Sequence, residues 1–421
     1  MSAARLRAKP WRSFSWAEYW VGQFAAWADN VIGWGAFGVK FGIYSCMSGM
    51  AWGGSEELWY QAARVLQKRG HEIAVNFKWW PKMSFQLQQL QEHGANISLR
   101  ERPPRIWQKK VHEVRLLLSP RSKPITSRNA NGLVWLKQTR PDAVLISIGY
   151  HPDQMLVANH LQAMNIPYAI NVQCASNSAF IHSDRMNVYR NWYQNARRVF
   201  FVSEENQHKI ETNLAVRLDN AEIVCNPFNV HLNRLPKWPK DDSVLRLACI
   251  GRIHFQSKGQ DLLVDLMRYD RWRQRPIEIR FYGHDQGNRR QLEELIRLHG
   301  LEDKLKIEGF TPELNNIWAE NHGLILPSRY EGAALVVVEA MLSNRMVIVT
   351  DTGRNSELID DGKSGFIAKS STVELLDDAL ERAWQQRKRW QEIGILAGRH
   401  IRERFSLDPI GEFANRIESI V

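Results

Sequence analysis

The sequence has few cysteines, and they lie far apart. The four among its 421 residues are Cys46, Cys174, Cys225 and Cys249. None belongs to a C-x-x-C pair, and no histidine lies at zinc-finger spacing from them. Neither a disulfide framework nor a structural zinc site is therefore indicated. A reducing cytoplasm fits this cysteine content best.

Long apolar runs are missing as well. The first 38 residues are basic and then rich in tryptophan, but Glu18, Asp29 and Lys40 interrupt every apolar run. A membrane-spanning helix needs about 20 consecutive apolar residues. We therefore expect neither a signal peptide nor a transmembrane helix, and we expect the protein to work in the cytoplasm.

Positive charge is distributed unevenly along the chain. The formal net charge is +11, of which the first 240 residues carry +14 and the remainder −3. This asymmetry indicates an anionic partner for the first half, and a phospholipid surface, a phosphorylated acceptor and nucleic acid all fit. The alternative is a basic surface that is merely solvated.

Basic residues are densest between Arg100 and Arg128, where only Glu101 and Glu113 oppose them. The basic residues there are Arg100, Arg102, Arg105, Lys109, Lys110, Arg115, Arg121, Lys123 and Arg128. Apolar residues lie among them, so the segment could lie in the headgroup interface of an anionic membrane. Alternatively, the apolar residues pack into a domain and the basic ones bind a soluble phosphorylated acceptor.

The length of the chain exceeds what one hydrophobic core usually serves, so we expect two domains. From about Val39 onward, β-rich apolar runs alternate with helical patterns, which is typical of parallel α/β domains. A linker is expected at Lys237–Asp242. The predicted organisation is an extension over residues 1–38, a first domain over 39–236, a second over 243–404, and a helical segment over 405–421 that packs back on the first domain.

Strands can be placed along both predicted domains from these apolar runs. In the first they are predicted at Lys40–Cys46, Glu72–Asn76, Ala143–Ile148, Tyr168–Val172, Val199–Val202 and Ile223–Cys225. In the second they are predicted at Leu245–Ile250, Ile277–Tyr282, Leu305–Ile307, Gly323–Leu326 and Met346–Thr350.

Two cations follow the first strand of the second domain. The strand Leu245–Ile250 runs into Gly251-Arg252, and Lys258-Gly259 comes just before a helix that begins near Gln260. Ligands of open α/β sheets bind at the carboxyl ends of strands. The loop therefore offers Arg252 and Lys258 to an anionic ligand.

Two glutamates, Glu331 and Glu339, lie eight residues apart across a predicted helix start. The small residues Gly332, Ala333 and Ala334 between them let a ligand approach the free N–H groups of that helix. The partial positive charge there suits a diphosphate. Glu339 falls in the apolar segment from Leu335 to Met341, where an unpaired carboxylate would be costly, so a plain surface position does not explain it.

With these motifs, the second half resembles the donor domain of retaining glycosyltransferase family 4, which has the GT-B fold of two facing Rossmann-like domains with a cleft between them. The phosphate loop of the family matches Gly251-Arg252 and Lys258-Gly259. Its E-x7-E motif matches Glu331 and Glu339. Further along, Asp351-Thr352-Gly353 and Glu357 match the turn and the acidic residue of the family.

The first half is similar to the same family at two places. Gly53-Gly54-Ser55-Glu56 resembles its glycine loop near the donor phosphates, and Asn226-Pro227 resembles the strand end that enters the interdomain linker. The resemblance covers about residues 40–405. It departs from the family after the strand Tyr168–Val172, where many members have a histidine and this sequence has Gln173-Cys174. His151 and His182 are the nearby alternatives on the acceptor side.

The resemblance implies a role for each matched residue. Arg252 and Lys258 would bind the leaving diphosphate, Glu339 the ribose and Glu331 a hydroxyl of the donor sugar. The remaining donor-site residues implied are Gly53, Gly54, Gly251, Gly283, Gly332, Ala333, Ala334 and Leu335. Transfer would go with retention to a glycan, a lipid-linked acceptor or another hydroxyl acceptor.

No cofactor is expected beyond the nucleoside-diphosphate-sugar that serves as donor. No Asp-x-Asp pair occurs, so the metal-chelating motif of the other large nucleotide-sugar transferase fold is missing and no metal is expected. Two alternatives stay open: a non-catalytic basic protein that binds glycan or nucleic acid on a GT-B scaffold, and a sugar-nucleotide epimerase. Because no compact nucleic-acid-binding module is evident, nucleic acid is not the expected partner.

Overall fold

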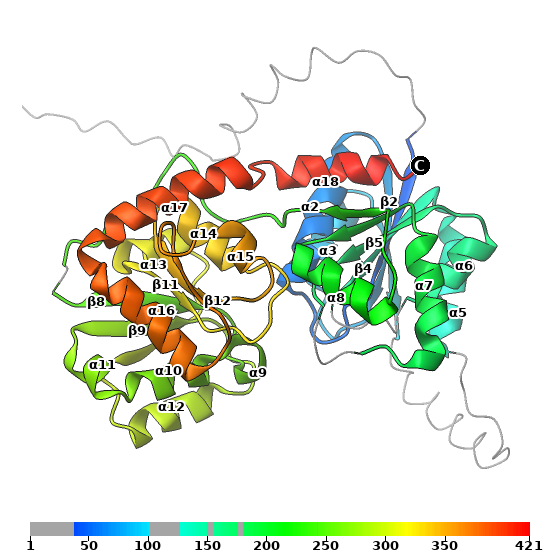
Figure 1. Cartoon of the computed structure of the whole chain (residues 1–421). Coiled ribbons are helices and arrows are strands. Elements are labelled where there is room, and N and C mark those ends of the chain that lie inside the picture. Colours follow the sequence, from blue (N-terminus) through cyan, green and yellow to red (C-terminus); the bar gives the residue numbers. More distant parts are fainter. Residues whose placement is uncertain (1–37, 102–126, 150–154, 176–179, 242) are drawn as a thin grey trace, which may run out of the picture. The chain divides into compact units, whose positions relative to one another are not determined.

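The computed structural model describes residues 38–101, 127–149, 155–175, 180–241 and 243–421 (Figure 1). The extension predicted at residues 1–38, apart from its last residue, lies outside this range. So do residues 102–126, which hold most of the basic stretch, and His151. Among the described residues, every helix is too short or too polar to cross a membrane.

Seven parallel strands form the first sheet, in the order β3-β2-β1-β4-β5-β6-β7. The strands are β1 (Lys40–Ser45), β2 (Glu72–Lys78), β3 (Asn96–Arg100), β4 (Ala143–Ile148), β5 (Tyr168–Val172), β6 (Arg198–Phe201) and β7 (Ala221–Ile223). The helices between them are α2 (Gly54–Lys68), α3 (Phe85–Glu92), α5 (Ser127–Thr139), α6 (Val157–Ala163), the 3-10 turn Ser183–Arg185, α7 (Met186–Gln194) and α8 (Glu204–Leu214). Every residue of β4 and β5 is buried, as expected for central parallel strands that are covered on both faces.

Six parallel strands form the second sheet, in the order β10-β9-β8-β11-β12-β13. They are β8 (Leu245–Ile250), β9 (Ile277–Tyr282), β10 (Leu305–Gly309), β11 (Gly323–Leu326), β12 (Met346–Thr350) and β13 (Phe366–Ala368). The helices are α9 (Phe255–Lys258), α10 (Gln260–Met267), α11 (Asp270–Gln274), α12 (Arg289–Leu298), α13 (Leu314–Glu320), α14 (Leu335–Leu342), α15 (Asn355–Leu358), α16 (Val373–Gln385), the 3-10 turn Arg387–Arg389 and α17 (Trp390–Arg404).

The predicted fold class is confirmed, because both sheets are parallel and alternate with helices. The strand predictions erred in three places. The edge strands β3 and β13 were not predicted, and β7 lies two residues before its expected position. All three lie at the edges of their sheets: β3 and β7 are partly exposed, and the buried strand β13 has only three residues, so each gives a weak signal in the sequence.

Each sheet has a point where the order of strands reverses. In the first sheet β1 lies between β2 and β4, and in the second β8 lies between β9 and β11. At such a point the loops that leave the two strands diverge and open a crevice at the carboxyl ends, which is where ligands bind in open α/β sheets. The loops after β1 and β8 are therefore the places to look for a site.

The last helix, α18 (Pro409–Glu418), returns to the first sheet. It lies beside α2 (Figure 1), and Phe413 packs edge-on against Phe200 with the ring centroids 5.2 Å apart. An ion pair of 2.7 Å joins Arg69 to Glu418. The predicted domain boundaries stay a prediction, because residues 40–421 form one compact unit.

The segment between the two sheets is held by a buried arginine. Arg345, only 2% exposed, donates to the carbonyl oxygen of Lys237 at 2.6 Å and to that of Asn321 at 3.0 Å. Burial lowers the pKa of its guanidinium to about 10. Trp238 covers this guanidinium at 5.2 Å from the ring centroid, so this part of the connecting segment is attached to the second sheet.

Candidate active site

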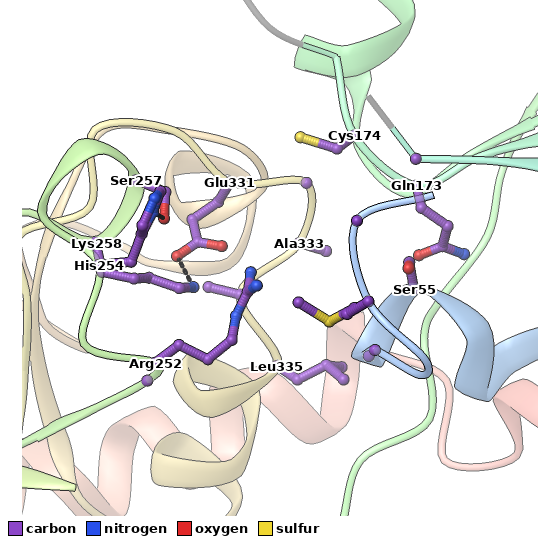
Figure 2. A pocket seen from close by; sticks show the side chains of 18 of the residues that line it. Ser55, Gln173, Cys174, Arg252, His254, Ser257, Lys258, Glu331, Ala333 and Leu335 are labelled. Carbon is purple, nitrogen blue, oxygen red and sulfur yellow. Dashed lines mark hydrogen bonds and ion pairs between the residues drawn. The ribbon is translucent and has the colours of Figure 1, made fainter. Parts of the chain in front are cut away.

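A cavity of about 730 Å³ opens at the carboxyl ends of the central strands (Figure 2). It is within the size range of small-molecule sites. One side is formed by residues 46–50 and 52–55, which follow β1, together with Gly149, Gln173, Cys174 and Asn226. The other side is formed by residues that follow β8, β9 and β11. The structure thus brings the loops at both switch points to one cavity.

The loop after β8 supplies the cations of the cavity. Gly251 and Arg252 follow the strand directly, and the short helix α9 ends at Lys258. The Nζ atom of Lys258 lies 2.5 Å from Oε1 of Glu331, as the dashed line in Figure 2 marks. Arg252 makes no ion pair with any described carboxylate. Arg252 is therefore available to an anion, while Lys258 is shared with Glu331.

Gly259 explains how Lys258 reaches the cavity. Its φ of +65° ends α9 in the left-handed region, and a Cβ there would lie 2.2 Å from the carbonyl oxygen of Pro327. Only glycine tolerates both the positive φ and the close approach of the Pro327 carbonyl. The β8 loop is thereby placed directly against the β11 loop that carries Glu331.

Two residues of the cation loop were not predicted from the sequence, although they lie between Arg252 and Lys258. His254 and Ser257 both line the cavity, with Nδ1 of His254 2.7 Å from Oγ of Ser257. Burial lowers the pKa of His254, and the charges of Arg252 and Lys258 lower it further. His254 is therefore neutral at pH 7 and adds a hydrogen-bonding group, not a third charge.

The loop after β11 carries Glu331 and the start of α14. Oε1 of Glu331 accepts a hydrogen bond of 2.6 Å from Ser328 in addition to its contact with Lys258. The helix begins at Leu335, and no side chain caps its N-terminus, which follows Ala334. Its first N–H groups therefore have no side-chain partner. Residues 332–336 line the cavity, so an anion bound there would be stabilised by these N–H groups.

Glu339 lies on the fifth residue of α14 and is buried at 7% exposure. Its Oε1 accepts a hydrogen bond of 2.9 Å from the N–H of Asn229, which belongs to the segment between the two sheets. Burial raises the pKa of its carboxyl to about 7, which the Asn229 hydrogen bond only partly opposes. Glu339 is not among the residues that line the cavity, so it lies behind the wall that Glu331 faces.

Gly332 lies where the two sides of the cavity meet. A Cβ at this position would lie 1.9 Å from the carbonyl oxygen of Gln173. The side chain of Gln173 is itself engaged: Oε1 accepts from Asn226 at 2.9 Å, and Nε2 donates to Asn171 at 3.3 Å. Gln173 therefore contributes a fixed backbone contact and not a free side chain.

The structure separates the remaining predicted residues. Gly53, Gly54, Ala333, Ala334 and Leu335 line the cavity. Gly283 does not, because it packs against Gly251: a Cβ there would lie 2.0 Å from the Gly251 carbonyl oxygen. His182 is exposed, hydrogen-bonded to Asp184 at 2.7 Å, and also outside the lining. His151 lies outside the described residues.

The first-half wall includes side chains that no motif pointed to. Met47, Met50 and Trp52 line it, in the stretch between the end of β1 and the predicted glycine loop. The indole N–H of Trp52 donates to Glu57 at 2.7 Å, which fixes the ring. Burial raises the pKa of the Cys174 thiol to about 12, so this lining residue is a neutral thiol. Position alone, directly after a central strand, could have indicated these residues.

Residues 245–386 match the family model described as glycosyl transferases group 1. This region therefore resembles a glycosyl transferases group 1 domain. It includes the cation loop, both glutamates and α14. Membership of family 4 in particular stays a prediction.

Curated relatives match parts of the chain. A lipopolysaccharide core biosynthesis mannosyltransferase of Rhizobium leguminosarum is 30% identical over 168 residues, which are 38% of this chain and 47% of the relative. A sucrose synthase of Acidithiobacillus caldus is 32% identical over 31% of this chain and 19% of the relative. The chain thus spans less than half the length of these relatives.

Solved structures match over nearly the whole chain. An Anabaena protein, HepE, in complex with UDP has a TM-score of 0.69 and 18% identity, covering 90% of this chain and all of the other. A glycosyltransferase from Rickettsia africae has a TM-score of 0.71 and 14% identity, covering 91% and 99%. At these identities the likeness establishes the fold, which is GT-B.

Proposed function

We propose that this protein is a retaining glycosyltransferase that moves a sugar from a nucleoside-diphosphate-sugar to a hydroxyl acceptor. One observation carries the proposal: Arg252, Lys258 and the N-terminus of α14 converge on one cavity beside Glu331. Two cations and a helix N-terminus offset the charge that develops on a diphosphate as the glycosidic bond breaks. Electrostatic stabilisation of this kind often contributes more to an enzymatic rate than any other single effect.

The ion pair between Lys258 and Glu331 gives these residues complementary roles. When a diphosphate enters, Lys258 gains a second anionic partner, and Glu331 still accepts from Ser328. Its carboxylate then faces the cavity as a hydrogen-bond acceptor for a hydroxyl of the donor sugar. Glu339 lies on the second turn of α14 and is suited to the ribose hydroxyls once Asn229 moves aside.

Retention is part of the proposal because Gly251-Arg252, Lys258-Gly259 and the E-x7-E pair of Glu331 and Glu339 resemble the motifs of a retaining family. In such a mechanism the departing diphosphate itself would assist the acceptor hydroxyl.

Glycans and lipid-linked sugars are the proposed acceptor class, since relatives include a lipopolysaccharide core mannosyltransferase and a poly(ribitol-phosphate) α-N-acetylglucosaminyltransferase. Among the described residues no group of three or more His, Cys, Asp and Glu could hold a metal ion. Metal-independent transfer stays part of the proposal, on the sequence observation that no Asp-x-Asp pair occurs. Attachment to the cytoplasmic face of an anionic membrane also stays a prediction, because the basic stretch that suggested it lies mostly outside the described residues.

The function is tested by incubating the protein with UDP-, GDP-, ADP- and TDP-sugars and a panel of glycan acceptors, with and without EDTA. We expect release of one nucleoside diphosphate, dependence on acceptor, an unchanged rate in EDTA, and an anomeric configuration in the product that matches the donor. Binding of a nucleotide-sugar without turnover would favour a binding protein. Conversion of the donor without acceptor to an isomeric nucleotide-sugar would favour an epimerase.

A further inference from the structure

Two hydrogen bonds join the two halves of the chain beside the cavity. In each, a carboxylate of one half accepts from a backbone N–H of the other half. Oε1 of Glu357, on α15, accepts a hydrogen bond of 2.8 Å from the N–H of Glu204, the first residue of α8. These residues lie 153 positions apart. Since the first N–H groups of a helix have no partner within it, Glu357 acts as a cap that comes from the opposite half of the chain.

The contact is reciprocal. Glu205, the second residue of α8, accepts a hydrogen bond from the N–H of Gly353, which lies just before α15. Each carboxylate also has a cation beside it: Arg354 lies 3.2 Å from Glu357, and Lys209 lies 2.6 Å from Glu205. Each half of the chain thus supplies one carboxylate and one backbone donor to the other.

Gly353 connects this exchange to the loop proposed to be catalytic. It has a φ of +62°, and a Cβ there would lie 2.7 Å from the carbonyl oxygen of Gly332 and 3.0 Å from Cβ of Glu331. Gly332 in turn touches the Gln173 carbonyl of the first half. A continuous line of contacts therefore runs from α8 through Gly353 to Glu331.

We propose that Glu357 is a positioning residue, which caps α8 from the second half and thereby holds the loop of residues 328–335 against the first-half wall of the cavity. This role rests on the proposed function. Glu357 touches no substrate: it fixes the distance between the wall that carries the donor and the wall that receives the acceptor. Small displacements of reacting groups are expensive, since an error of about 1 Å can lower a rate about 100-fold.

The structure offers a matched control for this role. Oγ of Ser203 accepts a hydrogen bond of 3.1 Å from the N–H of Asn206 and so caps the same helix from its own half. Both Ser203→Ala and Glu357→Ala remove one cap from α8. Only the second removes a contact between halves. Glu357→Gln keeps an acceptor oxygen and serves as the conservative variant.

The first experiment measures hydrogen exchange of backbone amides in the full-length protein, which needs no substrate. We expect Glu357→Ala to speed exchange at Gly353 and across residues 328–335 about tenfold or more, as expected for local opening. Ser203→Ala should speed exchange only at the start of α8. If the two variants give the same pattern, Glu357 is only a helix cap and the proposal is wrong, whether or not the protein transfers sugars.

The second experiment separates positioning from general stability. With a donor and acceptor that turn over, Glu357→Ala should lower kcat about tenfold or more and leave the Kd for the nucleoside diphosphate within about twofold of wild type. Glu357→Gln should recover most of the loss, and Ser203→Ala should leave kcat unchanged. A parallel loss of kcat and nucleotide affinity in Glu357→Ala, or no loss in kcat, would overturn the proposal. Should Glu357→Ala fail to fold, Glu205→Ala takes its place, because it removes the reciprocal hydrogen bond from Gly353 and should lower kcat while leaving the Kd for the nucleoside diphosphate unchanged.

Discussion

The two walls of the cavity differ in chemistry. The wall from the second half has the charged side chains of Arg252, Lys258 and Glu331, while the described residues of the first-half wall are neutral, with Met47, Met50 and Trp52 among them. A charged leaving group needs fixed charges and oriented N–H groups. A neutral acceptor is better served by an apolar, adaptable surface, and methionine side chains provide one. Under the proposed function, this difference would place the donor on the second-half wall and the acceptor on the first-half wall.

The largest effect is expected from the cations. Arg252→Ala and Lys258→Ala should each lower turnover about 100- to 1,000-fold, because each removes stabilisation of the developing diphosphate charge. The melting temperature should change little in Arg252→Ala, whereas Lys258→Ala also leaves the buried carboxylate of Glu331 without its cation and should lower it. Steady-state kinetics measure the effect, and Arg268→Ala, an exposed cation paired with Asp265 outside the cavity, is the control. An active double variant would remove the proposed distinction between the walls.

Glu339→Gln should change the dependence of stability on pH. Burial raises the pKa of Glu339 from 4.5 to about 7, so the folded protein holds this proton more tightly than the unfolded chain. The stabilising contribution is complete below pH 4.5 and is lost as the pH rises through about 7. Glutamine cannot ionise, so the stability of the variant relative to wild type should rise by about 2 to 3 kcal/mol between about pH 5 and pH 8.

Chemical denaturation at both pH values measures this change in stability. Glu56→Gln is the variant with which Glu339→Gln is compared. Glu56 is a buried residue of α2 in the first half, next in sequence to the lining residue Ser55, and burial raises its pKa to about 7 as well. Both variants should show the same direction of change in stability. Only Glu339→Gln should weaken binding of a nucleoside diphosphate. Equal weakening by both would contradict the assignment of the ribose to the second half.

Two glycines that line the cavity should respond differently to alanine. At Gly332 the new Cβ would lie 1.9 Å from the Gln173 carbonyl oxygen, so the walls must separate, and kcat should fall about tenfold or more. At Gly54 no atom lies within 4 Å of the new Cβ. Because Gly54 begins α2, alanine there should raise the melting temperature slightly, and any fall in kcat should be smaller than at Gly332. Loss of activity at Gly54 instead would indicate that a ligand passes close to the first-half backbone.

The smallest effect is expected at Met50. Met50→Ala removes apolar surface from the first-half wall, so the KM for acceptor should rise a few-fold while the Kd for nucleotide stays the same. The half-buried Met83, which is outside the cavity lining, gives the matched control Met83→Ala. Weaker nucleotide binding by Met50→Ala would place part of the donor on the first-half wall.

The central strands could be predicted from the sequence because their residues are apolar throughout most of their length, as in β4 and β5. The strand β13 could not, because its three residues are too short a run to stand out. Arg252, Lys258, Glu331 and Gly332 could be predicted to meet because strand ends of one parallel sheet share an edge. The position of Gly283 could not, because its contact with Gly251 depends on how two neighbouring loops cross.

The contacts between halves were also beyond prediction from sequence. Glu357 could be recognised as an acidic residue of a motif, but its partner is a backbone N–H 153 positions away, and backbone donors leave no trace in residue identity. The same holds for Glu339 and the N–H of Asn229. Ion pairs between side chains can be anticipated from patterns of charge in the sequence. A hydrogen bond from the backbone to a distant side chain can be anticipated only once the fold is known.

The central claim, that the second-half wall recognises a diphosphate, is tested most directly by calorimetric titration of the protein with UDP, GDP and the matching monophosphates. We expect wild type to bind one diphosphate at least about tenfold more tightly than its monophosphate, and we expect that preference to disappear when Arg252 and Lys258 are both replaced by alanine. A preference that survives in the double variant, or wild-type protein that binds no diphosphate at all, would contradict the account.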